Sequence, residues 1–145
     1  MAELKFNKPH EQVKAGAKAA AATVSPAPLD GTWSNCDKNT RNLVKVVIRS
    51  QGDTLYVHAY GACVPTPCDW GEVKGLAYAS SVAGGPAVAF SALYTFGFKD
   101  TILTGHLDGA SLVVEDFNTF KDGSGMGISF AGAGVNSDVP PPPIT

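Results

Sequence analysis

The chain has 145 residues, of which 44% are hydrophobic, and its formal net charge is −2 at pH 7. This length allows one domain with a hydrophobic core, and 16 Gly and 10 Pro predict many turns. The weak charge and the lack of a Lys/Arg cluster with interleaved aromatics argue against a nucleic-acid partner, and no apolar run reaches the roughly 20 residues that span a bilayer, so we expect no membrane partner.

Residues 1–29 differ in composition from the rest of the chain. Residues 9–22 favour a helix, but its nearly all-Ala face would bury little surface. Pro26 and Pro28 end any such helix, so we expect a flexible or partly helical arm and linker. Because Lys18 interrupts the Ala-rich stretch, it does not resemble a secretory signal. We therefore expect a cytoplasmic protein, with a secreted one as the alternative.

From residue 30 onward, the hydrophobic pattern alternates with a period of two, which is typical of β-strands. Turn signals such as Gly52-Asp53 and Asp108-Gly109 separate the alternating runs. The runs predict strands at residues 31–37, 43–50, 54–62, 72–80, 87–98, 101–107 and 111–120, and a weaker one at 126–131.

Short connections between these strands favour antiparallel neighbours. An all-β meander of seven or eight strands over residues 30–133 either closes into a small up-and-down β-barrel or splits into a β-sandwich. Closure is favoured because it removes exposed strand edges. Residues 134–145 contain four consecutive prolines and predict a disordered tail.

Residues 29–35, Leu-Asp-Gly-Thr-Trp-Ser-Asn, resemble the Gly-x-Trp opening of the calycin barrels, the superfamily of the lipocalins and avidins. Residues 71–79 resemble an avidin-type strand, and residues 98–108 resemble a later one more loosely. Residues 56–71 have no counterpart there, and the part after Phe120 lacks the Trp-bearing strand that closes a biotin site. The resemblance implies an eight-stranded barrel that holds a small molecule at its mouth, with Trp33 plugging one end and Asn35 contacting the ligand. It does not imply biotin.

Residues 56–71 combine a ring-rich strand with a firm Cys-Val-Pro-Thr-Pro-Cys corner. The strand alternates between an aromatic face (Tyr56, His58 and Tyr60) and an aliphatic face (Leu55, Val57 and Ala59). The usual arrangement turns the aliphatic face inward and leaves the aromatic face as a solvent-exposed or partner-binding stripe. The opposite arrangement gives a cavity lined by two phenols and an imidazole.

For the aromatic-inward arrangement we expect one ligand-binding cavity, lined by Asn35, Tyr56, His58, Tyr60, Trp70 and His106. Glu115 and Asp116 lie on opposite faces of their strand, so only one of them points inward. A His beside an inward carboxylate suits acid–base catalysis. The catalytic candidates are therefore His58, His106 and Glu115, and the alternative is that all of these side chains are solvated.

Three cysteines are present, and Cys63 and Cys68 bracket the Pro-containing corner. Their spacing does not match the Cys-x-x-Cys pattern of zinc sites, and no second pair follows at zinc-ribbon distance. We expect structural or inert cysteines, with a Cys63–Cys68 disulfide as the weaker alternative. We predict no metal site and no cofactor.

The pattern leaves three functions open. The first is a non-enzymatic, calycin-like barrel that binds a small, mostly apolar ligand. The second is an enzyme on the same barrel, an isomerase or cyclase with a His or carboxylate as its acid–base residue. The third is a lectin-like or protein-interaction module with Tyr56, Tyr60 and Trp70 as an exposed platform. The expected partner is a small-molecule ligand, and a homo-oligomer stays open.

Overall fold

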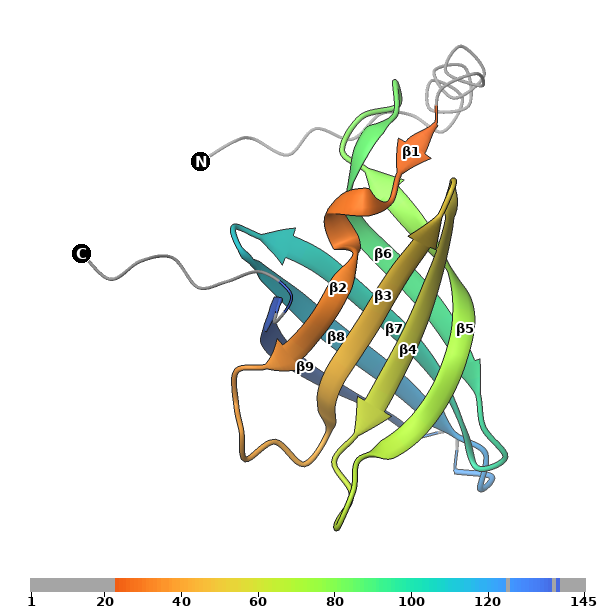
Figure 1. Cartoon of the computed structure of the whole chain (residues 1–145). Coiled ribbons are helices and arrows are strands. Elements are labelled where there is room, and N and C mark those ends of the chain that lie inside the picture. Colours follow the sequence, from red (N-terminus) through yellow and green to blue (C-terminus); the bar gives the residue numbers. More distant parts are fainter. Residues whose placement is uncertain (1–22, 125, 137, 139–145) are drawn as a thin grey trace, which may run out of the picture.

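The structure is a computed structural model that describes residues 23–124, 126–136 and 138, and in it eight antiparallel strands form one barrel (Figure 1). The barrel strands are β2 (Gly31–Asn35), β3 (Leu43–Gln51), β4 (Thr54–Gly61), β5 (Cys68–Ala79), β6 (Gly85–Thr95), β7 (Lys99–Asp108), β8 (Ser111–Phe120) and β9 (Gly127–Asn136). Each strand pairs with the next one along the chain, and β9 returns to pair with β2. The predicted up-and-down barrel is confirmed, and the sandwich alternative is wrong.

Most of the predicted arm lies outside the described residues, and so do residues 137 and 139–145 of the predicted tail. The barrel continues beyond the boundary that we expected at residue 133, because β9 extends to Asn136. Gly52 and Gly109 lie at the two predicted tight turns with φ angles of 62° and 60°, in the left-handed region that glycine adopts readily. None of the helical turns in the described segments is long and apolar enough to cross a membrane.

A short segment before β2 covers one end of the barrel, the upper end in Figure 1. There β1 (Val24–Ser25) pairs in parallel with β6, and a single 3-10 turn, η1 (Ala27–Leu29), follows. The η1 turn contacts both β3 and β6, which are far apart in the strand order, and Leu29 is fully buried. The indole Nε1 of Trp33 donates a hydrogen bond to the Leu29 carbonyl oxygen at 2.8 Å. Trp33 and Leu29 together therefore close this end.

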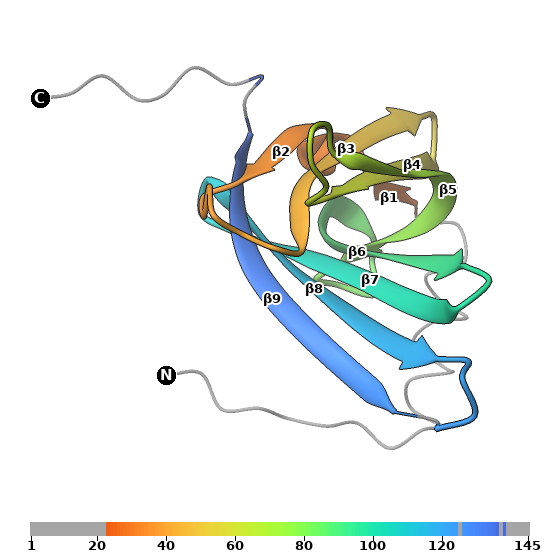
Figure 2. The same cartoon turned by 90° about the horizontal axis from the view of Figure 1, so that it is seen from below.

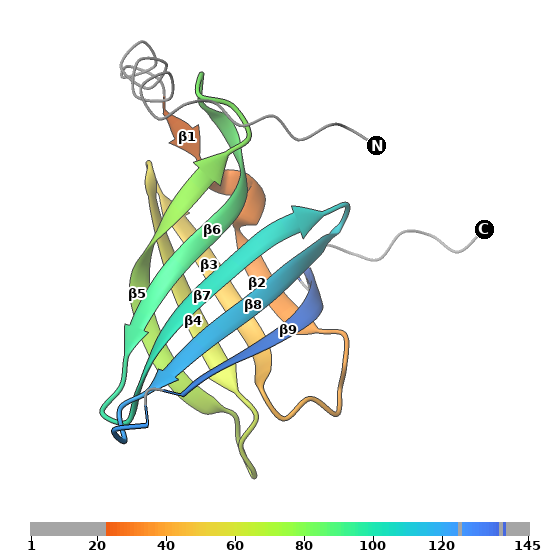
Figure 3. The ribbon, with the colours of Figure 1, turned by 180° about the vertical axis from the view of Figure 1, so that it is seen from behind.

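The hydrophobic core fills the barrel with the inward-facing side chains of alternate positions. Phe90 on β6 and Leu103 on β7 are among the fully buried residues. The Phe90 ring takes the space next to Gly105, where an added Cβ would lie 2.3 Å from Phe90 Cε1. Gly105 thus allows a large ring to pack directly on the backbone of β7. Seen from behind, β5 to β9 lie side by side across this part of the wall (Figure 3).

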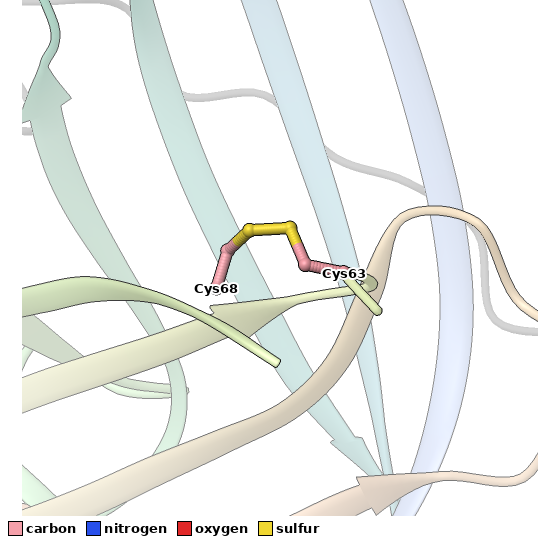
Figure 4. Close-up of a disulfide and its surroundings, with 2 residues drawn as sticks. All are labelled: Cys63 and Cys68. Carbon is pink, nitrogen blue, oxygen red and sulfur yellow. A yellow bond between two sulfur atoms is a disulfide. The ribbon is translucent and has the colours of Figure 1, made fainter. Parts of the chain in front are cut away.

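The Pro-containing corner joins β4 to β5 at the other end of the barrel. A disulfide links Cys63 and Cys68, whose Cα atoms are 5.3 Å apart (Figure 4). The Cys63–Cys68 disulfide, the weaker alternative from the sequence, is therefore the arrangement observed. Cys36 is free and exposed.

One part of the barrel wall is incomplete. β9 has 10 residues, whereas β2 has only 5. The two strands pair only from Trp33 opposite Asn136 to Asn35 opposite Gly134. Before Gly134, β9 has β8 on one side and, within the described part of the chain, no strand on the other (Figure 2).

Candidate functional site

The aromatic-inward arrangement of Tyr56, His58 and Tyr60, on which the predicted cavity depends, is wrong, and the usual aliphatic-inward arrangement is the one observed. These three side chains face outward, while Leu55, Val57 and Ala59 are at most 1% exposed and belong to the core. The reason is the limited volume inside the barrel. The interior of an eight-stranded barrel is so narrow that its inward side chains fill it. Large rings from β6, among them Phe90 and Tyr94, already occupy that space opposite the small aliphatic residues of β4.

The outward rings of β4 are covered by cations from β3. The Arg49 guanidinium lies 4.1 Å from the centre of the Tyr56 ring, and Lys45 Nζ lies 4.5 Å from the centre of the Tyr60 ring. Such cation–π contacts are weakly stabilising at an exposed site. The two phenol rings therefore have partners within the barrel itself.

His58 has partners on the same outer surface. Its ring stacks on the Tyr60 ring with centroids 4.6 Å apart, and its Nε2 is hydrogen-bonded to Asp69 Oδ1. The backbone N–H of Gly71 and then His58 hold the pKa of Asp69 below its usual range. This His–carboxylate pair is exposed to solvent rather than enclosed in a cavity.

Trp70 and His106 lie in two different environments. Trp70 turns toward the interior and meets Tyr94 edge to face, with ring centroids 5.5 Å apart. A register shift between β4 and β5 and the positive φ of Gly71 accompany this turn. His106 is exposed on the outer surface of β7. The expected common cavity of Asn35, Tyr56, His58, Tyr60, Trp70 and His106 is therefore not formed.

The inward carboxylate of β8 is Asp116 and not Glu115. Asp116 is 1% exposed, whereas Glu115 is half-buried on the opposite face of the strand. Both described histidines, His58 and His106, lie outside the barrel, so neither accompanies the inward carboxylate.

A pocket opens beside Asp116, between β2, β3, β8 and β9 and away from the end that η1 covers. The pocket has a volume of about 40 Å³. Trp33, Leu43, Val46 and Val114 form apolar walls, and the backbone of residues 131–134 forms another. The residues at the pocket with polar side chains are Asn35, Thr40, Asn42, Lys45 and Asp116. Of the predicted ligand-binding residues, only Asn35 lines this pocket; its Nδ2 donates to the Leu43 carbonyl oxygen at 2.9 Å.

Asp116 is held in a network of side-chain hydrogen bonds. Asn42 Nδ2 donates to its Oδ1 at 2.5 Å, and Asn118 Nδ2 donates to its Oδ2 at 2.8 Å. Asn118 Oδ1 in turn accepts from Thr101 Oγ1 at 2.8 Å and from Lys99 Nζ at 2.9 Å. A carboxylate can accept about four hydrogen bonds. Each oxygen of Asp116 therefore keeps the capacity to accept another.

Lys99 lies beside this network and over an aromatic cluster. Its Nζ is 4.6 Å from the centre of the Trp70 ring and 5.5 Å from that of Phe96. Burial lowers the pKa of Lys99, and the negative charge of Asp116 partly offsets this effect. In the described part of the chain, no Lys, Arg or His forms an ion pair with Asp116 at 4 Å or less. Lys99 is linked to Asp116 through Asn118, which hydrogen-bonds to both side chains.

Tyr94 fixes the inner surface of β4 and β5 near this cluster. Its hydroxyl oxygen accepts from the Ala59 N–H at 3.1 Å. The hydroxyl proton has two acceptors, the carbonyl oxygens of Val57 at 3.0 Å and Gly71 at 2.9 Å. Burial raises the pKa of Tyr94 from 10.0 to about 12. Tyr94 is therefore a neutral, structural phenol at physiological pH.

Our reading of the sequence missed the network of Asn42, Thr101, Asp116 and Asn118. One signal was available, because Asp116 and Asn118 continue the period of two that begins with Leu112 and Val114. If the apolar residues of that strand face inward, the two polar ones must do so as well. Among the described residues, no group of three or more His, Cys, Asp or Glu could hold a metal ion.

The closed eight-stranded antiparallel barrel is consistent with the resemblance to calycins, but such a barrel is not specific to that superfamily. No family model, no curated protein and no solved structure matches the chain.

Proposed function

We propose that the protein binds a small, mostly apolar molecule that carries an N–H donor, and that the donor contacts Asp116 in the pocket between β2, β3, β8 and β9. One observation carries the proposal: a carboxylate that is 1% exposed lines a partly apolar pocket and has only amide hydrogen-bond partners. Buried charges are usually paired, so an unpaired carboxylate at a pocket favours a cationic or N–H-donating ligand.

The walls of the pocket support the apolar part of this ligand. Trp33, Leu43 and Val114 offer apolar surface, and small-molecule sites typically combine such walls with a few polar groups that fix orientation. Asn35 and Asn42 supply further amide groups to the lining of the pocket. The pocket volume of about 40 Å³ has room for a donor group but not for a whole ring, so the expected ligand places its donor group at Asp116 and its apolar part at the open mouth of the pocket.

The interaction module is a second candidate, because Tyr56, His58 and Tyr60 form an outward stripe on β4. Two observations weaken it. The rings of Tyr56 and Tyr60 already have cationic partners, and Trp70, the third member of the expected platform, packs against the core. The enzyme reading lacks an inward His, since His58 and His106 lie on the outer surface.

The test compares three compounds that share one ring and differ in the polar group: benzylamine, benzamide and benzoate. Binding is measured by saturation-transfer NMR and by titration. We expect benzylamine to bind best, benzamide more weakly and benzoate least, because Asp116 attracts a cation and repels an anion. Equal binding of benzoate and benzylamine would contradict the proposal.

The matched variants are Asp116→Asn and Asp108→Asn, each of which removes one negative charge. Asp108 is the last residue of β7 and is exposed. Asp116→Asn should weaken benzylamine binding at least tenfold, or about 1.4 kcal/mol, and should leave benzoate no longer disfavoured. Asp108→Asn should change neither the binding of benzylamine nor that of benzoate. Urea unfolding of both variants checks that each still folds.

A further inference from the structure

We propose that the open edge of β9 binds an extended peptide that carries a Lys or Arg side chain, with the peptide backbone adding a strand and the basic side chain reaching toward Asp116. This inference rests on the proposed function, because the basic side chain would be the N–H-donating group that the pocket accepts. Addition of a strand to an exposed sheet edge is a known mode of peptide recognition.

The backbone geometry identifies which groups of β9 are available. In an antiparallel strand, the N–H and C=O of one residue point to the same side, and successive residues alternate sides. The Ala133 carbonyl oxygen accepts from the Cys36 N–H at 2.9 Å, so Ala133 points away from β8. Ala131 and Ser129 must point the same way. Within the described residues, their N–H and C=O groups on this side have no strand to pair with.

The sequence of β9 leaves this edge unprotected. Natural sheets usually protect exposed edges with charged residues or proline, because unpaired edges invite pairing with another chain. β9 reads Gly-Ile-Ser-Phe-Ala-Gly-Ala-Gly-Val-Asn and has no Lys, Arg, Asp, Glu or Pro. An edge without these features can accept an added strand.

The inner face of β9 shows what an added strand would cover. Ile128 lies opposite Asn118 in the β8–β9 ladder and Phe130 lies opposite Asp116, so both hydrophobic side chains face the barrel interior. Nevertheless Ile128 is 37% exposed and Phe130 is 48% exposed. The missing neighbour on the open side explains this exposure. Apolar side chains on the inward face of a bound peptide would bury both residues.

Asp116 specifies the charge of the peptide. Neighbouring strands are about 4.8 Å apart, so a peptide residue beside Phe130 would lie about 10 Å from Asp116 along the sheet. The curvature of the barrel shortens this distance, and long Lys and Arg side chains place a charged group far from their own backbone. A basic residue facing inward at this position would supply the cation that Asp116 lacks. A carboxylate there would be repelled.

The probe is a heptapeptide with a central lysine, valines two positions to either side and threonines between them, acetylated and amidated at its ends. Binding is measured by fluorescence anisotropy of a labelled copy and by competition with benzylamine. Replacing the lysine with norleucine should weaken binding at least tenfold. Two further peptides carry one backbone N-methyl group each, at adjacent residues near the centre. Only the peptide methylated on the side facing β9 should lose binding, because N–H groups alternate sides.

The protein variants are Ser129→Pro and its matched control Ser129→Ala. Proline removes the open-side N–H of Ser129, and an edge strand tolerates it there because that N–H makes no bond to β8. Ser129→Pro should abolish peptide binding, and Ser129→Ala should retain it. Both variants should still bind benzylamine, which also shows that both still fold.

The outcomes separate this inference from the proposed function. If benzylamine binds through Asp116 but the peptide does not bind, the peptide inference is overturned and the proposed function stands. If benzylamine does not bind, the proposed function fails. If both N-methylated peptides bind equally, or if norleucine substitutes for lysine without loss, the proposed binding mode is overturned. A dimer that Ser129→Pro dissociates would assign the edge to a second copy of the chain and would overturn the inference as well.

Discussion

Asp116 and Phe130 lie directly opposite each other in the β8–β9 ladder and point to the same side of the sheet, yet Asp116 is 1% exposed and Phe130 is 48% exposed. In a complete barrel wall, two such neighbours would both be enclosed. The difference marks the place where the wall opens, because β2 ends at Asn35 while β9 continues past it. The interior of the barrel is therefore reached from its side as well as from its end.

Asn118→Leu should destabilise the protein by about 2–4 kcal/mol, because the substitution removes one hydrogen-bond partner from each of Asp116, Thr101 and Lys99. Urea unfolding measures the loss. Thr119→Val, at the exposed neighbouring position, should change the free energy of unfolding by less than about 0.5 kcal/mol. Similar values for the two variants would mean that the network contributes little to stability.

Trp33→Ala should destabilise the protein by about 3–5 kcal/mol, because it removes a large side chain that is 5% exposed and bonds to the Leu29 carbonyl oxygen. The control is Phe98→Ala, since Phe98 is 63% exposed. Thermal and urea unfolding give the two values. A loss below about 1 kcal/mol for Trp33→Ala would contradict its role in closing the barrel end.

Gly105→Ala should destabilise the protein by about 1–3 kcal/mol, because the new methyl group would lie 2.3 Å from Phe90 Cε1. The second variant, Phe90→Leu, removes that ring atom and is measured alone and together with Gly105→Ala. We expect the double variant to be more stable than the sum of the two single effects predicts. Strict additivity would show that the Phe90 ring does not limit the size of residue 105.

Stability at high pH should depend on Tyr94. Its phenol ionises near pH 10 in the unfolded chain but near 12 in the folded protein, so its contribution is complete below pH 10 and declines between pH 10 and 12. After allowance for partial solvent screening, this decline should be about 1–2 kcal/mol. The difference in unfolding free energy between the wild type and Tyr94→Phe should therefore shrink from pH 9 to pH 12. A constant difference would contradict the raised pKa.

The double substitution Cys63→Ser and Cys68→Ser should destabilise the protein by about 2 kcal/mol or less, because the disulfide closes only a short loop with a sequence separation of 5. The wild type treated with a reductant should show the same loss. Cys36→Ser should have little effect, since Cys36 is free and exposed. A much larger loss in the double variant would show that the corner organises more of the barrel than its own loop.

The strand pattern could be predicted from the sequence because it rests on local signals. Alternation defined β3 and β8 well, and glycines such as Gly52 and Gly109 marked the turns between strands. The start of β5 was placed too late, because the bulge at Gly71 interrupts the alternation after Cys68. The antiparallel order followed from the short connections, and closure followed from the removal of exposed strand edges.

The candidate site was harder to predict because alternation defines two faces of a strand without saying which is inside. For β4, the decision depends on volume, and the rings of Phe90 and Tyr94 on another strand leave room only for Val57 and Ala59. For β8, Asp116 occupies an inward position that a hydrophobic pattern alone assigns to an apolar residue. A polar residue at such a core position depends on hydrogen-bond partners from distant strands, which the local sequence does not reveal.

The segment that carries Leu29 and Trp33 has a kinetic consequence. Since these two residues obstruct one end of the barrel, no path runs from end to end through the described part of the barrel. A ligand beside Asp116 must therefore leave on the side away from η1, and a second ligand cannot displace it from the η1 end. The dissociation rate of a bound ligand should therefore be independent of the concentration of a competing ligand.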